Sequence, residues 1–319
     1  MLNFIFLIGG TALIIFSAGW LVNGASAIAK KFGINDLVIG LTIVAFGTSA
    51  PELTVNIFSA LKGSTDIAVG NVLGSNISII FLIVGVAAVI YPIHIQRNTK
   101  WKEIPFSLLA IIILGILAND ILIDKGNSNL ISRSDGFILL SFLIIFFIYT
   151  FGIAKHGNLS AETEEHIQDL PFRKSLFFII AGLTGLYFGG KYLIDGAVNI
   201  AKLLGMSERV IGLTIIAVGT SLPELATSIV AARKKKPDII IGNIIGSNIF
   251  NVFFILGTTA TISPLPFNAQ INFDLIIAGI ASVLLFLTTI LIGKKIITRT
   301  EGIIFLIIYV SYITYSVIS

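Results

Sequence analysis

Charged residues are scarce in this chain, and cysteine is absent. Of its 319 residues, only 12% are Asp, Glu, Lys or Arg, about half the share that is typical of a water-soluble domain. This shortage excludes a soluble enzyme. The lack of cysteine excludes disulfides, thiolate metal sites and cysteine nucleophiles, and it indicates no particular compartment. The net charge of +4 is not a nucleic-acid signal, because it follows from basic loops between apolar runs.

Long apolar runs take the place of the missing charge. The chain is 55% hydrophobic, with a mean hydropathy of +0.99, and a membrane helix needs about 20 apolar residues. The strands of a membrane barrel would be about 10 residues long and would alternate in polarity, which these runs do not. The first run follows Met1-Leu2-Asn3 without a basic segment, so we expect a retained span and not a cleaved signal peptide. We predict ten transmembrane helices, at about 3–22, 38–61, 67–91, 104–122, 136–154, 175–196, 210–232, 238–263, 273–293 and 302–318.

The two sets of five runs are copies of each other. Residues 38–53 and 210–225 are identical at thirteen of sixteen positions, with a constant offset of 172. The same offset aligns Gly-Asn at 70–71 and Gly-Ser-Asn-Ile at 74–77 with their second copies. The chain is therefore an internal duplication.

Five spans per copy predict an inverted arrangement, because an odd number makes the second copy enter the bilayer in the opposite direction. With the N-terminus outside, the inner loops hold fifteen Lys and Arg residues and the outer loops hold six. Positive residues favour the cytoplasmic side. We therefore expect a multi-pass protein of the cell membrane with both termini outside. Its halves would be 1–154 and 175–319, joined by a cytoplasmic linker at 155–174.

Two glutamates lie deep inside apolar runs. Glu52 and Glu224 occupy equivalent positions, and no Lys, Arg or His lies in the same spans. A lone ionisable group in a membrane costs about 3 kcal/mol, so it normally faces a cavity or a partner. Each glutamate could instead be protonated and join helices through a hydrogen bond. Their symmetry and the lack of a basic partner favour a bound cation.

The residues before each glutamate predict a broken helix. Pro51 and Pro223 have no amide hydrogen, and their rings clash with the carbonyls of Gly47 and Gly219. Freed carbonyls at membrane depth are tolerated only in protein or beside a watery cavity. A single proline kink would be unremarkable in a membrane helix. Two matching breaks, each followed by glutamate, indicate the ion site of a transporter.

The third and eighth spans add small polar residues. Gly-Asn and Gly-Ser-Asn stand at 70–71 and 74–76 and again at 242–243 and 246–248. These residues could simply let helices pack closely and hydrogen-bond across the contact. The serines are also candidate ligands, because hydroxyl, carbonyl and carboxylate oxygens suit hard cations such as calcium. The lack of nearby His or Cys argues against zinc or copper.

The paired Gly-Thr-Ser-X-Pro-Glu and Gly-Ser-Asn motifs resemble the calcium/cation antiporter superfamily, in particular its compact prokaryotic sodium/calcium exchangers. The resemblance covers the whole chain. It implies that spans 2, 3, 7 and 8 form a central diamond around the ions, and that spans 1 and 6 slide across it. The fold class we expect is an all-α integral membrane protein with ten helices in two inverted five-helix repeats, broken in helices 2 and 7 at a central ion site.

The resemblance also implies the ligands. Calcium would be held by Glu52 and Glu224 together with the carbonyls of Thr48 and Thr220. Sodium would in addition use four hydroxyls and two backbone carbonyls, those of Ser49, Ser221, Ser75, Ser247, Ala45 and Ala217.

Two residues depart from the family pattern. Ile79 stands where the compact exchangers usually carry a polar residue, often asparagine, and Asn251 stands where many members carry aspartate. In the eukaryotic branches, asparagine there accompanies potassium-independent exchange. We include Asn251 among the candidate ion-site residues, whose carboxylates then number two.

These observations predict a secondary antiporter that extrudes calcium in exchange for sodium. The alternatives are calcium/proton exchange, a cation channel, and an intramembrane hydrolase built on the two carboxylates. We expect no enzyme activity, no cofactor, no nucleic acid and no obligate protein partner. The expected partners are calcium, sodium and the lipid bilayer.

Overall fold

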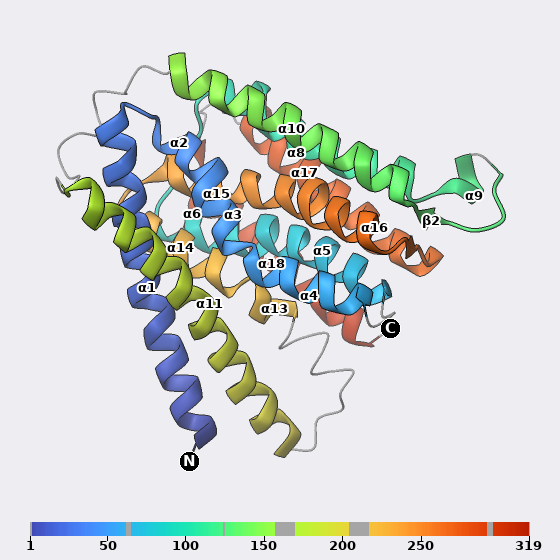
Figure 1. Ribbon diagram of the computed structural model, residues 1–319, viewed down its shortest axis with the longest axis horizontal. Helices are drawn as coiled ribbons and strands as arrows, with labels where there is room; N and C mark the ends of the chain where they lie inside the picture. Colours follow the sequence, from blue (N-terminus) through green and yellow to red (C-terminus); the bar gives the residue numbers. More distant parts are fainter. Residues whose placement is uncertain are drawn as a thin grey trace.

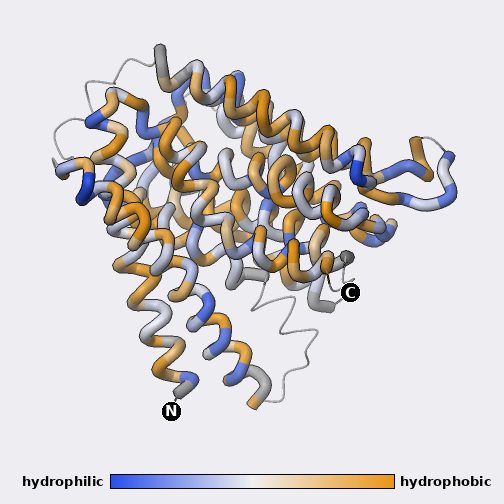
Figure 2. The backbone as a smooth tube through the Cα atoms, in the orientation of Figure 1, coloured by the Kyte–Doolittle hydropathy of each residue, from blue (hydrophilic) through white to orange (hydrophobic). Residues whose placement is uncertain are grey.

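The computed structural model describes residues 2–61, 65–123, 125–156, 170–203, 217–291 and 296–318. Helices make up nearly all of it, and the long ones pack side by side (Figure 1). Hydrophobic residues run along most helices, while hydrophilic residues concentrate in loops and at helix ends (Figure 2). The prediction of an all-helical protein is confirmed.

Many of the helices are interrupted by short elements, of which η1, η2 and η5 are π-helical and η6 is a 3-10 turn. The first half contains α1 (Leu2–Phe32), α2 (Asp36–Ile39), η1 (Gly40–Val44), α3 (Ala45–Thr48), α4 (Ala50–Leu61), α5 (Thr65–Ser78), η2 (Ile79–Ile83), α6 (Val84–Ile90), β1 (Ile93–His94), α7 (Arg97–Trp101), α8 (Glu103–Leu117), α9 (Asp120–Ile123), β2 (Leu130–Ile131) and α10 (Arg133–His156). The second half contains α11 (Phe172–Leu203), α13 (Ala217–Thr220), α14 (Leu222–Arg233), α15 (Pro237–Ile249), η5 (Phe250–Leu256), α16 (Gly257–Ile262), β3 (Leu265–Pro266), η6 (Ala269–Ile271), α17 (Asn272–Leu291), β4 (Ile296–Ile297) and α18 (Arg299–Ile318).

Several helices meet the length and polarity of a membrane span. Among the described residues there are six, namely Asn3–Phe32, Ala68–Ile90, Arg133–Gly152, Phe172–Ile200, Pro237–Ile262 and Ala269–Ile290. A seventh span results if Asp36–Thr48 and Ala50–Leu61, bent by 44°, count as one. The other three predicted runs contain α8 with 15 residues, α18 with 20, and the pair α13 and α14. Ten spans therefore stay a prediction.

The first helix of each half is longer than the apolar run that predicted it. α1 continues to Phe32 and α11 to Leu203, where the runs end at about 22 and 196. Alanines fill much of the extra length of α1, and Ala25, Ala27 and Ala29 are buried. Small helix-forming residues packed against protein extend a helix without the long apolar run that lipid contact requires.

α1 and α11 form an antiparallel pair (Figure 1). A Cβ atom added to Gly10 would lie 2.7 Å from the backbone nitrogen of Leu193, and one added to Gly24 would lie 2.7 Å from the carbonyl oxygen of Ser175. The early residues of α1 thus face the late residues of α11. Glycine at these positions lets the two backbones approach closely.

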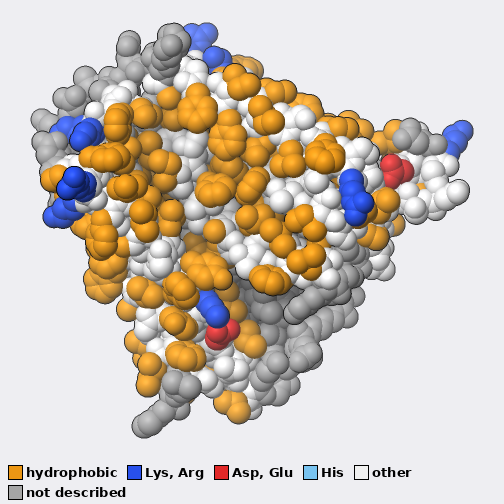
Figure 3. Space-filling model, viewed as in Figure 1, with side chains coloured by type: hydrophobic (Ala, Val, Ile, Leu, Met, Phe, Trp, Pro, Cys, Tyr) orange, Lys and Arg blue, Asp and Glu red, His pale blue; other side chains and the backbone are white. Residues whose placement is uncertain are grey.

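The third and eighth predicted spans lie at the centre of the molecule. Of the residues in an 18-residue apolar stretch of each helix, 94% are buried in the helix at 237–262 and 72% in the one at 68–90, but only 28% in α10. Peripheral helices present large apolar side chains, such as Ile148 at 68% exposure. Hydrophobic side chains cover much of the face in Figure 3, and Lys and Arg gather mainly near its edges. This distribution suits a chain surrounded by lipid.

Two very short strand pairs link the halves. β1 pairs with β4, and β2 pairs with β3, both antiparallel. The pattern of apolar runs did not predict them, because two-residue strands in loops have no periodicity that a sequence could reveal.

Candidate ion-binding site

The two Gly-Thr-Ser-X-Pro-Glu segments break their helices in the same way. α3 ends and α4 begins around Ser49, whose φ and ψ are −83° and 8°, and α13 and α14 meet at Ser221, with −85° and 6°. Proline two residues later cannot donate the hydrogen bond that would continue the helix. The sequence therefore predicted both breaks correctly in the described residues.

Both glutamates begin the helices that follow the breaks, and both are buried. Glu52 is 0% exposed and Glu224 is 1% exposed. Their carboxylates are close enough for their charges to interact. Among the described residues no cluster of three or more His, Cys, Asp or Glu side chains exists, so the acidic centre has two carboxylates at most.

Hydroxyl groups reach each carboxylate from the other half of the chain. Ser49 Oγ donates to Glu224 Oε1 at 3.0 Å, and the Thr48 side chain faces the same carboxylate. In the same manner Thr220 faces Glu52. The hydroxyls of each Gly-Thr-Ser segment thus face the glutamate of the opposite copy, and both halves contribute to one site.

The serine of the third span also reaches this centre. Ser75 is buried on α5, and its Oγ donates to Glu52 Oε1 at 3.5 Å. Its counterpart Ser247 is buried on α15.

Several buried oxygens of the predicted ligand set have no hydrogen-bond partner among the described residues. They are Glu52 Oε2, Glu224 Oε2, Ser221 Oγ and Ser247 Oγ. Buried polar atoms in proteins nearly always have a partner, so such a group of four needs an explanation. Oxygen atoms of carboxylates and hydroxyls are the donors that hard cations such as calcium prefer. The chemistry of this donor set therefore fits a cation.

The predicted backbone ligands lie in the broken helices. The carbonyl of Ala45 accepts the amide hydrogen of Ser49 at 3.1 Å, and a carbonyl oxygen keeps a second lone pair for another contact. Ala217 is the first residue of α13, and Thr220 is its last.

Amide side chains form a layer where the central helices cross. Asn76 Nδ2 donates to the carbonyl of Asn248 at 3.3 Å, so residues at the duplication offset of 172 meet each other. Asn251 Nδ2 donates to Asn76 Oδ1 at 2.9 Å. Asn251 therefore lies against another amide, and its Oδ1 has no partner among the described residues.

Both departures from the family pattern lie in π-helical turns. Ile79 begins η2 and is buried, and Asn251 is the second residue of η5. π-helical turns within helices often mark functional sites.

Sequence reasoning missed one residue of the network. Thr48 Oγ1 donates to Asn243 Oδ1 at 3.1 Å, and Asn243 Nδ2 donates to Ser228 Oγ at 3.4 Å. Asn243 belongs to the Gly-Asn motif, but Ser228 was not singled out. It lies one helical turn after Glu224, on the same helix face, and this spacing was the available signal.

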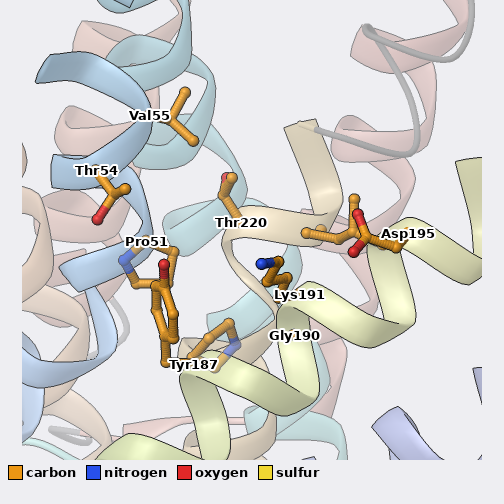
Figure 4. Close-up of a pocket in the computed structure, with 11 residues that line it drawn as sticks. Pro51, Thr54, Val55, Tyr187, Gly190, Lys191, Asp195 and Thr220 are labelled. Carbon is orange, nitrogen blue, oxygen red and sulfur yellow. The ribbon is translucent and has the colours of Figure 1, made fainter. Parts of the chain in front are cut away.

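A cavity of about 240 Å³ adjoins the centre (Figure 4). It lies between α4, α11 and the break of the second half, and its walls include Pro51, Thr220 and Pro223. Since Thr220 also faces Glu52, the cavity reaches the neighbourhood of the carboxylates.

The fold and this centre define a class of protein. Broken helices that enclose acidic and hydroxyl oxygens inside a helical membrane protein are typical of ion transporters.

The family follows from comparison with known proteins. The family model described as sodium/calcium exchanger protein matches residues 2–152 and 174–318. The chain belongs to this family, whose members are membrane antiporters and not enzymes. The resemblance inferred from the paired motifs is thereby confirmed.

Individual relatives agree with the assignment. The chain is similar to the sodium/calcium exchanger MaX1 of Methanosarcina acetivorans, with 31% identity over 342 aligned positions that cover 98% of this chain and 97% of the relative. It is 38% identical to the inner membrane protein YrbG of Escherichia coli over 265 residues, covering 81% and 79% of the two chains. A solved structure of the sodium-calcium exchanger NCX_Mj, soaked with sodium and calcium, matches with a TM-score of 0.83 and 33% identity over 98% of both chains.

Proposed function

We propose that this protein is a secondary antiporter that exports calcium in exchange for sodium. The observation that carries the proposal is the buried pair Glu52 and Glu224, each with an unpartnered oxygen and each approached by a hydroxyl of the other half, from Thr220 and Ser49 respectively. Two carboxylates supply two negative charges, which one calcium ion neutralises. Two or more sodium ions can replace it at the same oxygens.

The ligand roles follow from the donor chemistry and the family. Calcium would bind between the two carboxylates and the carbonyls of Thr48 and Thr220. Sodium ions would bind at smaller groups of oxygens around this centre. They would use the hydroxyls of Ser49, Ser221, Ser75 and Ser247 and the carbonyls of Ala45 and Ala217. The position of Asn251 against Asn76 supports a role for Asn251 beside the ions, as a neutral amide in the layer next to the carboxylates.

The proposed architecture is ten spans in two inverted repeats. Three observations support it: the constant offset of 172, the antiparallel pair α1 and α11, and the contact of Asn76 with its counterpart Asn248. In this arrangement α1 and α11 slide together across the central helices and expose the carboxylates to each side in turn. Their glycine-lined contact with each other would let them move as one unit.

Calcium/proton exchange is the second candidate. It is favoured by the lack of a Lys, Arg or His in the two broken spans, because two protons could then neutralise the glutamates as two sodium ions would. Calcium flux in proteoliposomes with separately imposed sodium and proton gradients distinguishes the two. We expect a sodium gradient at constant pH to drive calcium uptake. Uptake driven by a pH gradient alone would favour the proton antiporter, and passive conduction without coupling would favour a channel.

The proposed orientation has both termini outside and residues 155–174 in the cytoplasm. Because the chain has no cysteine, single cysteines can be introduced and labelled with a thiol reagent that does not cross membranes. We expect Ser160→Cys to be labelled only after the cells are opened, and Lys125→Cys to be labelled in intact cells. Labelling of residue 160 from outside would contradict the inverted topology.

A further inference from the structure

Two side chains of opposite charge, Lys191 and Asp195, face the cavity that lies beside the ion-binding centre. Lys191 and Asp195 line it from α11, one helical turn apart, and the opposite wall holds Pro51 and Thr220. Figure 4 shows both side chains extending from α11 on the side that faces Thr220. Both residues are exposed. Within the described part of the chain, neither side chain makes a hydrogen bond or an ion pair.

The charges are a feature of the second half alone. At the offset of 172, Lys191 corresponds to Gly19 and Asp195 to Asn23, while Leu21, Gly24 and Ala25 have identical counterparts. Leu21 and Gly24, which contact α11, are thus repeated in the second half, and only the second half carries Lys and Asp at the two differing positions. A duplicated packing surface needs no such difference, because the uncharged residues pack equally well in the first half.

An ammonium group in this position acts on every cation that approaches the carboxylates. The cavity has a volume of only about 240 Å³, so an ion inside it stays within a Debye length of about 8–10 Å from Lys191. The repulsion is proportional to the charge of the ion, and it is therefore twice as large for calcium as for sodium.

We propose that Lys191 weakens the binding of each cation in this cavity in proportion to its charge, so that it repels a calcium ion more strongly than a single sodium ion, and that Asp195 partly offsets this repulsion. The inference rests on the proposed function and deepens it. In a calcium exporter the cavity side must release calcium and accept sodium. A fixed positive charge there lowers the affinity for both ions, and calcium loses the square of the factor that sodium loses.

The test measures equilibrium binding to the purified full-length protein. Calcium binding is titrated with ⁴⁵Ca²⁺, and the sodium affinity is obtained from competition at several calcium concentrations, so that it is separated from the change in calcium affinity. For Lys191→Met we expect sodium affinity to rise about threefold and calcium affinity about tenfold, the square of the sodium factor. Asp195→Asn is expected to lower both affinities, and the factor for calcium is again expected to be the square of the factor for sodium. Adding choline chloride should shrink all these changes, because salt screens charges.

A matched pair of labels separates charge from packing. In Lys191→Cys, a cationic thiosulfonate reagent should restore the wild-type affinities, and an anionic reagent of similar size should raise calcium affinity further. Lys125→Met, which removes the same charge from an exposed loop outside the cavity, should change neither affinity.

The outcomes are distinct. Equal factors for sodium and calcium, or equal effects of the two labels, would overturn the role of Lys191 while leaving the antiporter proposal intact. A wild-type protein that binds no calcium would instead contradict the proposed function.

Discussion

The two halves of the molecule carry nearly the same motif and surround it differently. In the second half the open cavity separates α11 from Pro51, Thr54 and Val55 of α4. At the corresponding place in the first half α1 packs against α14. There the ammonium of Lys234 donates to the carbonyl of Gly19 at 3.3 Å and to the side-chain oxygen of Asn23.

This contrast cannot come from the motifs, because residues 38–53 and 210–225 are nearly identical. It follows instead from the position of the α1 and α11 pair, which packs against α14 on one side and borders the open cavity on the other. In an alternating-access protein the two surroundings would exchange when the pair slides. The different surroundings of the two nearly identical segments would then be a property of one conformational state of the protein.

The largest expected effect comes from removing either carboxylate, because each half contributes one glutamate at an equivalent position to the proposed calcium site. Glu52→Gln and Glu224→Gln should each lower calcium affinity about thirty- to several-thousandfold, since loss of one buried charged partner costs about 2–5 kcal/mol. Sodium-driven calcium flux and ⁴⁵Ca²⁺ binding are the measurements.

The matched control for these variants is another buried carboxylate. Glu103 is 1% exposed and accepts a hydrogen bond from Tyr149, away from the broken helices. Glu103→Gln is expected to keep calcium binding. Substantial flux in either site variant, with folded protein in the membrane, would remove the proposed site.

A smaller effect is expected from the contact that closes the route in the first half. Lys234→Met removes the hydrogen bonds to Gly19 and Asn23, and a hydrogen bond from a charged group contributes about 1.5–3 kcal/mol. The balance should therefore shift toward the state open on that side. Burial and the neighbouring Lys236 charge lower the pKa of Lys234, so its positive charge is lost at a lower pH than that of a free lysine. The neutral amine is a weaker hydrogen-bond donor, and alkaline pH should therefore shift the balance in the same direction.

The readout for this shift is labelling of single cysteines from either side. A cysteine at Asn23 should become more reactive from the cytoplasmic side in the Lys234→Met background, and a cysteine at Asp195 should become less reactive from outside. Unchanged labelling at both positions would show that the contact does not hold the closed state.

The smallest expected effect concerns Asn251, an amide of the central layer whose counterpart at the offset of 172 is the apolar Ile79. We expect wild-type transport to need no potassium. Asn251→Asp replaces a donor to Asn76 with a group that must lose its proton before it attracts a cation, so calcium flux should fall several-fold more at acid pH than in the wild type. Flux is measured between about pH 5.5 and 8, with and without potassium. Wild-type flux that requires potassium would contradict the predicted potassium independence. An identical pH profile in the variant would contradict the predicted acid sensitivity of Asn251→Asp.

The sequence predicted the two helix breaks and the two buried glutamates because these features arise from residues that are close together in the chain. A glutamate in an apolar run, a proline before it and a glycine four residues before the proline are adjacent in the chain. Their consequences, a broken helix and a buried charge, need no tertiary information. The duplication is also visible in the sequence alone, because the constant offset of 172 between matching residues is read directly from the residue numbers.

The tertiary structure decided which groups meet. No pattern shows that Ser49 bonds Glu224 and not Glu52, or that Ser228 joins Thr48 through Asn243, because these contacts join residues that are far apart in the chain. It also decided that Lys191 and Asp195, which the sequence places near the end of an apolar run, face a cavity beside the carboxylates. The sequence determines which oxygen-bearing side chains are present and where the helices break, because both depend on residues close together in the chain. The packing of one half against the other determines which of these groups contact each other.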